Sequence, residues 1–348
     1  MQTWLIIIIP AVFFATMVPN QYEPLMTGES YKYRYGRCFA IISGMILAVC
    51  AGLRYCVGTD YGNYCNMWWR YISDWKTDIL TFNEPGFSML TKISSLVYNN
   101  YASMFFVVSI LTIGLYVRSL YRYSPEFGSA IFLYILYGEW QHSFNGIKQY
   151  LAAAIVFAGY GYLKDRKLIR YVIVVLLASC FHISALVMMP VFYLCDRKVT
   201  IKNIALLILC GIAISASYER VFSVVENIDA SFTINEYVTE GVKWQRVLLS
   251  FFPLLLSVQC WNDLKWDSNF RCSFNLAMLN SVIMVACMNS RYLTRFSYYT
   301  QIYAVMLLTQ LFPKMEANAR WYKIIIYIVY ALFWVIETQT GFYWVFNR

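Results

Sequence analysis

Residues 39–65 read FAIISGMILAVCAGLRYCVGTDYGNYC, and this stretch decides the fold class. Residues 39–53 carry no charge and are nearly long enough to cross about 30 Å of hydrocarbon as a helix. Arg54 and Asp60 follow directly, among glycines and tyrosines. An uncharged run that ends in charged and aromatic residues is typical of a transmembrane helix leaving the bilayer.

The rest of the chain repeats this pattern. Its 348 residues are 60% hydrophobic and only 14% charged, whereas soluble domains carry about 25% charged residues. We predict an all-α polytopic membrane protein with about twelve transmembrane helices. The first apolar run lacks the basic start of a signal peptide, so we expect it to be retained. The predicted spans are 3–18, 38–53, 101–117, 128–141, 146–163, 169–182, 183–195, 201–217, 246–260, 272–289, 296–312 and 322–340.

We expect one transmembrane domain over residues 1–348, with two long outside loops. Residues 54–100 form the first and include an amphipathic helix near 85–99, and residues 218–245 form the second. Most of the 28 Lys and Arg residues fall in alternate connections between spans. The positive-inside rule makes these connections cytoplasmic and places both termini outside.

A small set of ionisable residues then lies at the outer ends of the spans. A charge near hydrocarbon costs about 2.5–3.5 kcal/mol, so such residues tend to be functional. A basic cluster on one membrane face predicts an anionic substrate. The set consists of Arg54, Asp60, Lys148, His182, Arg291 and Arg295.

The loop after residue 53 has the composition of a sugar-binding surface. Tyr61 and Tyr64 offer flat faces, Asp60 offers a carboxylate, and Gly58 and Gly62 allow tight turns. The alternative is a belt of interfacial aromatics with a turn capped by Asp60, and the two readings weigh about equally.

Lys148 and His182 each allow two readings. Asn145 is expected to N-cap the helix that carries Lys148, which would add a positive dipole end suited to phosphate; the alternative is a lysine that snorkels to the interface. His182 falls in a predicted tight turn, where it could accept a proton or donate a hydrogen bond. The alternative is a buried histidine satisfied by a neighbour.

Arg291 and Arg295 are spaced i, i+4, so on a helix they share one face. Their guanidinium groups suit a diphosphate. Alternatively, they anchor a helix end, or pair with Glu337 or with the acidic loop 219–240, which could cover the site.

Signatures of soluble enzymes are absent from the sequence: it has no P-loop, GxGxxG, GxSxG, HExxH or DxD pattern. No CxxC pair or Cys/His metal spacing occurs either. The sequence leaves open whether Cys56 and Cys65 form a disulfide.

Three ordered segments resemble the EpsG family of exopolysaccharide proteins, which belongs with the Wzy-type polymerases. They are GLRYCVGTDYGNY, FNGIKQYLAAAI with a basic KDRK turn after it, and CFHISALVMMPVFYL. The later SRYLTRF is similar to an arginine/tyrosine segment of such proteins. One departure is Lys148, which stands where the family pattern FNxIRQ has arginine.

The resemblance implies a GT-C-like fold in the bacterial inner membrane and a periplasmic site. There, undecaprenyl-diphosphate-linked oligosaccharides would be donor and acceptor. Apart from the resemblance, we expect a direct displacement with inversion, which needs no cofactor or metal because diphosphate is already a good leaving group. The resemblance also implies membrane lipid and a chain-length-regulating co-polymerase as partners, and no nucleic acid. A lipid-linked oligosaccharide flippase and an O-antigen ligase remain alternatives.

Within that chemistry each candidate has an expected role. Asp60 is the first choice for the base and His182 the second. Arg54, Lys148, Arg291 and Arg295 would bind diphosphate. The expected sugar contacts are Tyr61, Tyr64, Asn145, Gln149 and Tyr292.

Overall fold

The structure is a computed structural model, and it describes residues 2–20, 30–195, 197, 205, 209, 241–265, 267–289, 294–315, 319–338 and 343. Every regular element among them is an α-helix or a 3-10 helix, which confirms the all-α prediction. The chain divides into two compact units, residues 1–189 with 315–348, and residues 190–314. The predicted span 201–217 and the loop 219–240 lie almost entirely outside the described residues.

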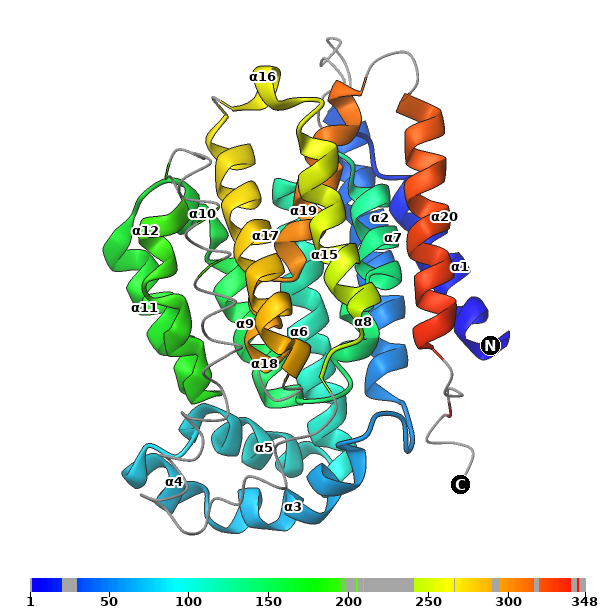
Figure 1. Cartoon of the computed structure of the whole chain (residues 1–348). Helices are drawn as coiled ribbons and strands as arrows, with labels where there is room; N and C mark the ends of the chain where they lie inside the picture. Colours follow the sequence, from blue (N-terminus) through cyan, green and yellow to red (C-terminus); the bar gives the residue numbers. More distant parts are fainter. Residues whose placement is uncertain are drawn as a thin grey trace. The chain divides into compact units, whose positions relative to one another are not determined.

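The first unit contains most of the long helices (Figure 1). Its elements are α1 (Gln2–Thr16), α2 (Ser30–Gly52), α3 (Tyr61–Ser73), α4 (Trp75–Thr81), α5 (Pro85–Val97), α6 (Tyr101–Tyr123), α7 (Phe127–Leu136), α8 (Glu139–His142), α9 (Ile147–Ala158), α10 (Tyr160–Lys164), α11 (Leu168–Ser179), the 3-10 helix η1 (Ile183–Met188) and α20 (Ala319–Glu337).

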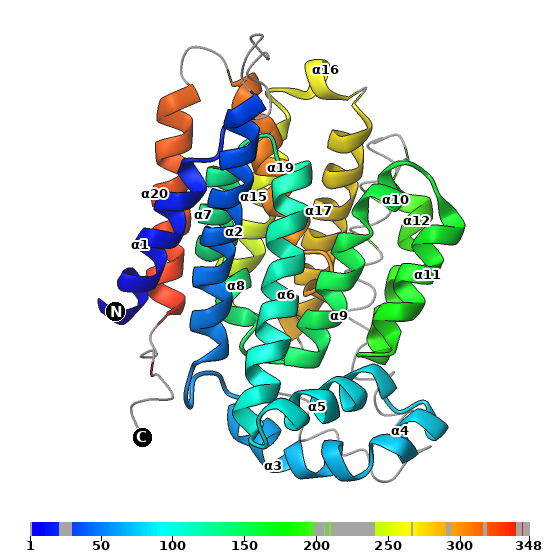
Figure 2. The same ribbon diagram turned by 180° about the vertical axis from the view of Figure 1, so that it is seen from behind.

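Helices α2, α6 and α9 lie side by side and form the frame of this unit (Figure 2). Two glycines of α2 allow the close approach to α6. A Cβ at Gly44 would lie 2.9 Å from a methyl carbon of Val117, and one at Gly52 would lie 2.9 Å from the Cα of Phe106. Small residues at a helix interface permit this contact between backbones, as in membrane helix pairs.

Two helical stretches are long and apolar enough to cross a membrane, Tyr35–Gly52 and Tyr101–Tyr123, and several apolar helices are shorter. This count covers only the part of the chain that the structure describes. The predicted run 146–163 is divided at Gly159 into α9 and α10, and the run 183–195 consists of η1 followed by a short helix after Pro190. The twelve spans and the GT-C-like architecture therefore stay predictions.

Residues 54–100 are largely helical and form α3, α4 and α5, which lie across the end of α6 where that helix begins (Figures 1 and 2). Small polar residues of α5, Thr91 and Ser94, are buried. Large apolar side chains point outward, with Leu80 85% exposed and Val97 87% exposed. An apolar outer surface next to a helix that is long enough to cross a membrane is what an interfacial segment requires.

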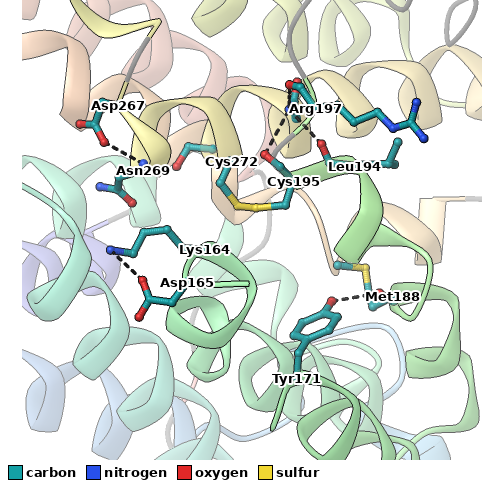
Figure 3. The surroundings of a disulfide bond; sticks show 12 residues. Lys164, Asp165, Tyr171, Met188, Leu194, Cys195, Arg197, Asp267, Asn269 and Cys272 are labelled. Carbon is teal, nitrogen blue, oxygen red and sulfur yellow. Dashed lines mark hydrogen bonds and ion pairs between the residues drawn. A yellow bond between two sulfur atoms is a disulfide. The ribbon is translucent and has the colours of Figure 1, made fainter. Parts of the chain in front are cut away.

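The second unit contains α12 (Val191–Cys195), α15 (Trp244–Ser257), α16 (Trp261–Leu264), α17 (Ser268–Ala286), η2 (Cys287–Asn289), α18 (Thr294–Ser297), α19 (Ile302–Leu311) and η4 (Phe312–Lys314). A disulfide joins Cys195 of α12 to Cys272 of α17 (Figure 3). Asn275, one turn further along α17, lies 2.9 Å from the carbonyl oxygens of Leu194 and Arg197. Both contacts hold the end of α12 against α17.

Candidate functional site

The glycine-rich segment after α2 docks onto the turn before α9. The backbone N–H of Thr59 donates to Oδ1 of Asn145 at 2.6 Å, and the N–H of Gly146 donates to Oδ2 of Asp60 at 2.9 Å. Gly58 has a φ of +104°, and a Cβ there would lie 2.8 Å from Oδ1 of Asn145. Only glycine fits at this position. Two motifs that are 86 residues apart in the sequence thus form one local structure.

The expected N-cap by Asn145 is wrong. Gly146 is the N-cap residue of α9, with a φ of +54° and no side-chain capping bond. The Asn145 side chain instead accepts hydrogen bonds from the backbone and the hydroxyl of Thr59. Asp60 uses the N–H of Gly146, so the carboxylate already lies near the positive end of the helix dipole.

Arg54 is buried beneath this turn, with only 1% of its surface exposed. Its guanidinium donates to the carbonyl oxygens of Ala51 at 2.6 Å and Phe144 at 3.3 Å, and to the hydroxyl of Ser109 at 3.2 Å. It also lies 4.9 Å from the ring centroids of Phe105 and Phe144. Burial lowers the pKa of Arg54 to about 10, so the group stays charged at neutral pH. Its hydrogen bonds hold the turn in place.

Glu84 brings Lys148 and His182 together. Oε2 of Glu84 forms an ion pair with Nζ of Lys148, and Oε1 is hydrogen-bonded to Nδ1 of His182. All three side chains are partly accessible: Glu84 is 14%, Lys148 18% and His182 22% exposed. The ammonium of Lys148 also lies 5.6 Å from the ring of Tyr71 and 5.8 Å from that of Phe87.

Three chain segments fix this cluster. Glu84 has a φ of +50° and precedes Pro85, which opens α5. The N–H of Gly86 donates to the carbonyl of Cys180 at 2.8 Å, which attaches the start of α5 to the end of α11. Helix α11 ends at Ser179 and η1 begins after His182, so the predicted turn at this histidine is confirmed.

The environment of Glu84 keeps it ionised. Burial by itself raises the pKa of this carboxyl group, but the hydrogen bond with His182 and the charge and hydrogen bond of Lys148 together outweigh burial. The net result is a pKa below the ordinary value for glutamate. A stable carboxylate on Nδ1 of an imidazole fixes the tautomer that leaves Nε2 as the acceptor.

The structure also places the residues that were expected to bind sugar. Tyr61 is 4% and Tyr64 8% exposed, and Tyr61 stacks on Phe105 with ring centroids 4.5 Å apart. Both tyrosines lie on the buried face of α3 and belong to the hydrophobic core that includes Phe105. Nε2 of Gln149 donates to the hydroxyl of Ser184 at 3.2 Å, which connects α9 to η1 just beyond His182.

Arg291, Tyr292 and Arg295 belong to the second unit. Arg295 lies in α18 with an exposed side chain. Arg291 and Tyr292 lie outside the described residues. Cys56 and Cys65, which could have been paired, are both free thiols.

Glu84 is the residue that the sequence reasoning missed. The available signal was charge balance: Lys148 and His182 were placed on the same predicted face, and no carboxylate partner was predicted for either of them. Glu84 precedes a proline that starts an amphipathic helix on that face, and such a helix start holds an acidic side chain in a defined position.

The chain matches a known protein family. The model of the EpsG family matches residues 37–344, which covers most of the chain and includes Arg54, Asp60, Glu84, Lys148 and His182. No curated protein and no solved structure matches the chain.

Proposed function

Because the chain belongs to the EpsG family, which is associated with Wzy-type polymerases, we propose that it polymerises undecaprenyl-diphosphate-linked oligosaccharides. In this proposal, repeat units are joined at the outer face of the bacterial inner membrane. The apolar helices and the family both fit a membrane protein of polysaccharide biosynthesis. The observation that carries the proposal is the cluster of Glu84, Lys148 and His182.

The cluster supplies a proton acceptor for glycosyl transfer. An acceptor hydroxyl attacks the anomeric carbon of the donor, and the bond from that carbon to the diphosphate oxygen breaks with inversion. The bonding electrons leave with undecaprenyl diphosphate, and the hydroxyl proton moves to Nε2 of His182. Glu84 holds the imidazole through Nδ1 and stabilises the positive charge that develops on the ring.

Asp60 was the first choice for the base, and its geometry favours another role. Its Oδ2 accepts the Gly146 N–H, two residues before Lys148. We therefore assign Asp60 to positioning of the turn and His182 to the proton transfer. This assignment reverses their order from the sequence analysis.

The cations divide into two groups in the proposed mechanism. In this proposal Lys148 neutralises the departing diphosphate. For Arg291 and Arg295, diphosphate binding stays a prediction from the sequence. Lys148 keeps an ammonium with three donors, so one donor can contact Glu84 while others reach a phosphate oxygen. Arg54 acts as a positioning residue, because its guanidinium donates to protein groups and is buried.

A genetic experiment separates the proposed polymerase from a flippase. Strains that carry Glu84→Gln or His182→Gln in place of the native gene are expected to accumulate single repeat units outside the membrane, without long chains. Asp74→Asn is the matched control, because Asp74 is an exposed carboxylate of the same loop. A strain in which no repeat unit reaches the outside would contradict the polymerase assignment and favour a flippase. Surface polysaccharide of full length in both variants would remove the cluster from the mechanism.

A further inference from the structure

A second charged site lies at the far end of α9 from the Glu84 cluster. A cavity of about 380 Å³ is lined there by residues from the end of α6, from α9 and α10, and from the start of α11. Lys148 is the second residue of α9, whereas Ala158, which lines the cavity, is the last. At 1.5 Å per residue, these positions are about 15 Å apart along the helix axis. The cavity is therefore separate from the proposed reaction site.

Basic side chains dominate the lining of this cavity. Arg118 and Arg122 come from one face of α6, and Lys167 and Arg170 come from the turn before α11 and from α11 itself. Asp165 is the one carboxylate in the lining. Four cations around one carboxylate give a strongly positive cavity, which favours an anionic ligand.

The carboxylate in the lining is already paired. Asp165 forms ion pairs with Lys164 at 3.3 Å, shown in Figure 3, and with Lys167 at 3.8 Å. Within the described ranges, none of the three arginines forms an ion pair with a carboxylate. They differ in this respect from Arg70, which pairs with Asp78 at 3.6 Å.

Two of the arginines are held by aromatic rings. The guanidinium carbon of Arg122 lies 5.4 Å from the ring centroid of Tyr123, and that of Arg170 lies 5.9 Å from that of Tyr162. A guanidinium held against a ring keeps its N–H edge available for hydrogen bonds. Planar donor edges of this kind suit the oxygens of a phosphate group.

The surface of α11 beside the cavity is apolar and exposed, so acyl chains could pack against it. Ile169 and Ile173, on either side of Arg170 in α11, are 76% and 59% exposed. Tyr162 is 37% exposed and combines an apolar ring with a polar tip, as residues at the membrane interface do. A soluble phosphate ester would make no use of this apolar helix surface, whereas a phospholipid would cover it.

We infer that this cavity binds the phosphate-bearing headgroup of an anionic phospholipid, with its acyl chains against α11. By the positive-inside assignment, the site faces the cytoplasmic leaflet, whereas the proposed transfer centre faces outward. Basic pockets between membrane helices on that side are suited to anionic headgroups. The site neither depends on the proposed transfer reaction nor contributes a residue to it.

The test measures lipid binding by the purified full-length chain in nanodiscs of phosphatidylcholine. Phosphatidylglycerol or cardiolipin is titrated in, and bound lipid is counted by native mass spectrometry. Arg118→Gln with Arg122→Gln is expected to weaken retention of anionic lipid about 30-fold, because two basic residues at about 1 kcal/mol each correspond to that factor. Arg170→Gln, from a different helix, should weaken it in the same direction.

The matched control is Arg37→Gln with Lys314→Gln, which removes two exposed cations from other predicted cytoplasmic positions. This variant should retain the lipid as the native chain does. If the cavity variant and the control lost anionic lipid equally, general surface charge would explain the binding, and the proposed lipid site would be wrong. Displacement of the lipid by millimolar inorganic phosphate or glycerol phosphate would overturn the lipid assignment in favour of a soluble ligand. The thermal midpoint of each variant checks that the fold is intact.

Discussion

His182 is hydrogen-bonded through Nδ1 to Oε1 of Glu84, although 98 residues separate the two in the sequence. The other carboxylate oxygen of Glu84 is paired with Lys148. One glutamate therefore orients an imidazole and balances an ammonium at once. This relationship accounts for the ionised state of Glu84 and underlies the proposed proton transfer.

The ionised Glu84 should make the stability of the protein depend on pH. Since its pKa is depressed in the folded protein, its contribution is present above the pKa of an ordinary glutamate and is lost as the pH falls through the lower, folded value. Glu84→Gln should therefore lower the thermal midpoint at neutral pH and make it less sensitive to acid. Melting curves of both proteins across the acidic range test this. Asp74→Asn is the control and should show the same pH dependence as the native protein. If the thermal midpoint of Glu84→Gln fell with acid in parallel with that of the native protein, the prediction would be wrong.

Arg54 should behave as a structural residue. Arg54→Ala leaves the carbonyls of Ala51 and Phe144 without their donor and empties a site between two rings. We expect a loss of about 3 kcal/mol or more in unfolding free energy, or a failure to accumulate in the membrane. Arg70→Ala removes an ion pair whose arginine side chain is 46% exposed, and Asp78 keeps its hydrogen bonds from Asn83 and Ser88, so the change should cost less than about 1 kcal/mol. Denaturant unfolding in detergent compares the two, and an Arg54→Ala protein of native stability would contradict the assigned role.

Two glycines of the first motif should differ sharply. Gly58→Ala places a methyl group against Asn145 at a positive φ and should cost about 1–3 kcal/mol. It should also reduce polysaccharide chain length by loosening the turn that carries Lys148. Gly62→Ala meets nothing within 4 Å in helix α3 and should be neutral or slightly stabilising. Chain length on gels and thermal midpoints are the readouts; equal effects at both positions would contradict the docking geometry.

The disulfide between Cys195 and Cys272 tests the orientation assigned from charge. Both residues are next to connections that the positive-inside rule places in the cytoplasm, where thiols are kept reduced. The orientation therefore predicts free thiols in growing cells and a disulfide only after oxidation. Acid quenching of cells, followed by alkylation with a large maleimide, distinguishes the two states on a gel. A pair that is fully oxidised before lysis would reverse the orientation of this segment.

Several features of the structure could be predicted from local patterns in the sequence. Uncharged runs predicted helices, and the glycines and Asp60 of the first motif indicated a tight turn. The turn at His182 also followed from the sequence, because two apolar runs meet there. Each of these features depends on residues that are near one another in the chain.

The relationships between distant segments could not be predicted in the same way. Arg54 was expected to bind diphosphate because of its charge, but Ser109 and Phe144, which come from later segments, enclose it. Glu84 has no recognisable motif around it, and its partners follow only after α5 docks on the end of α11. Asn145 was expected to cap its own helix, but its side-chain oxygen accepts hydrogen bonds from the backbone and the hydroxyl of Thr59 instead.

The most direct test of the central claim uses purified protein and one defined undecaprenyl-diphosphate-linked repeat unit, with no nucleotide sugar and with EDTA present. The native chain should produce a ladder of products that grow by whole repeat units. His182→Gln should slow the ladder by about 10²-fold or more, since general base catalysis contributes about that factor, and Asp74→Asn should leave it unchanged. A native ladder from His182→Gln, or no ladder from the native chain, would contradict the account.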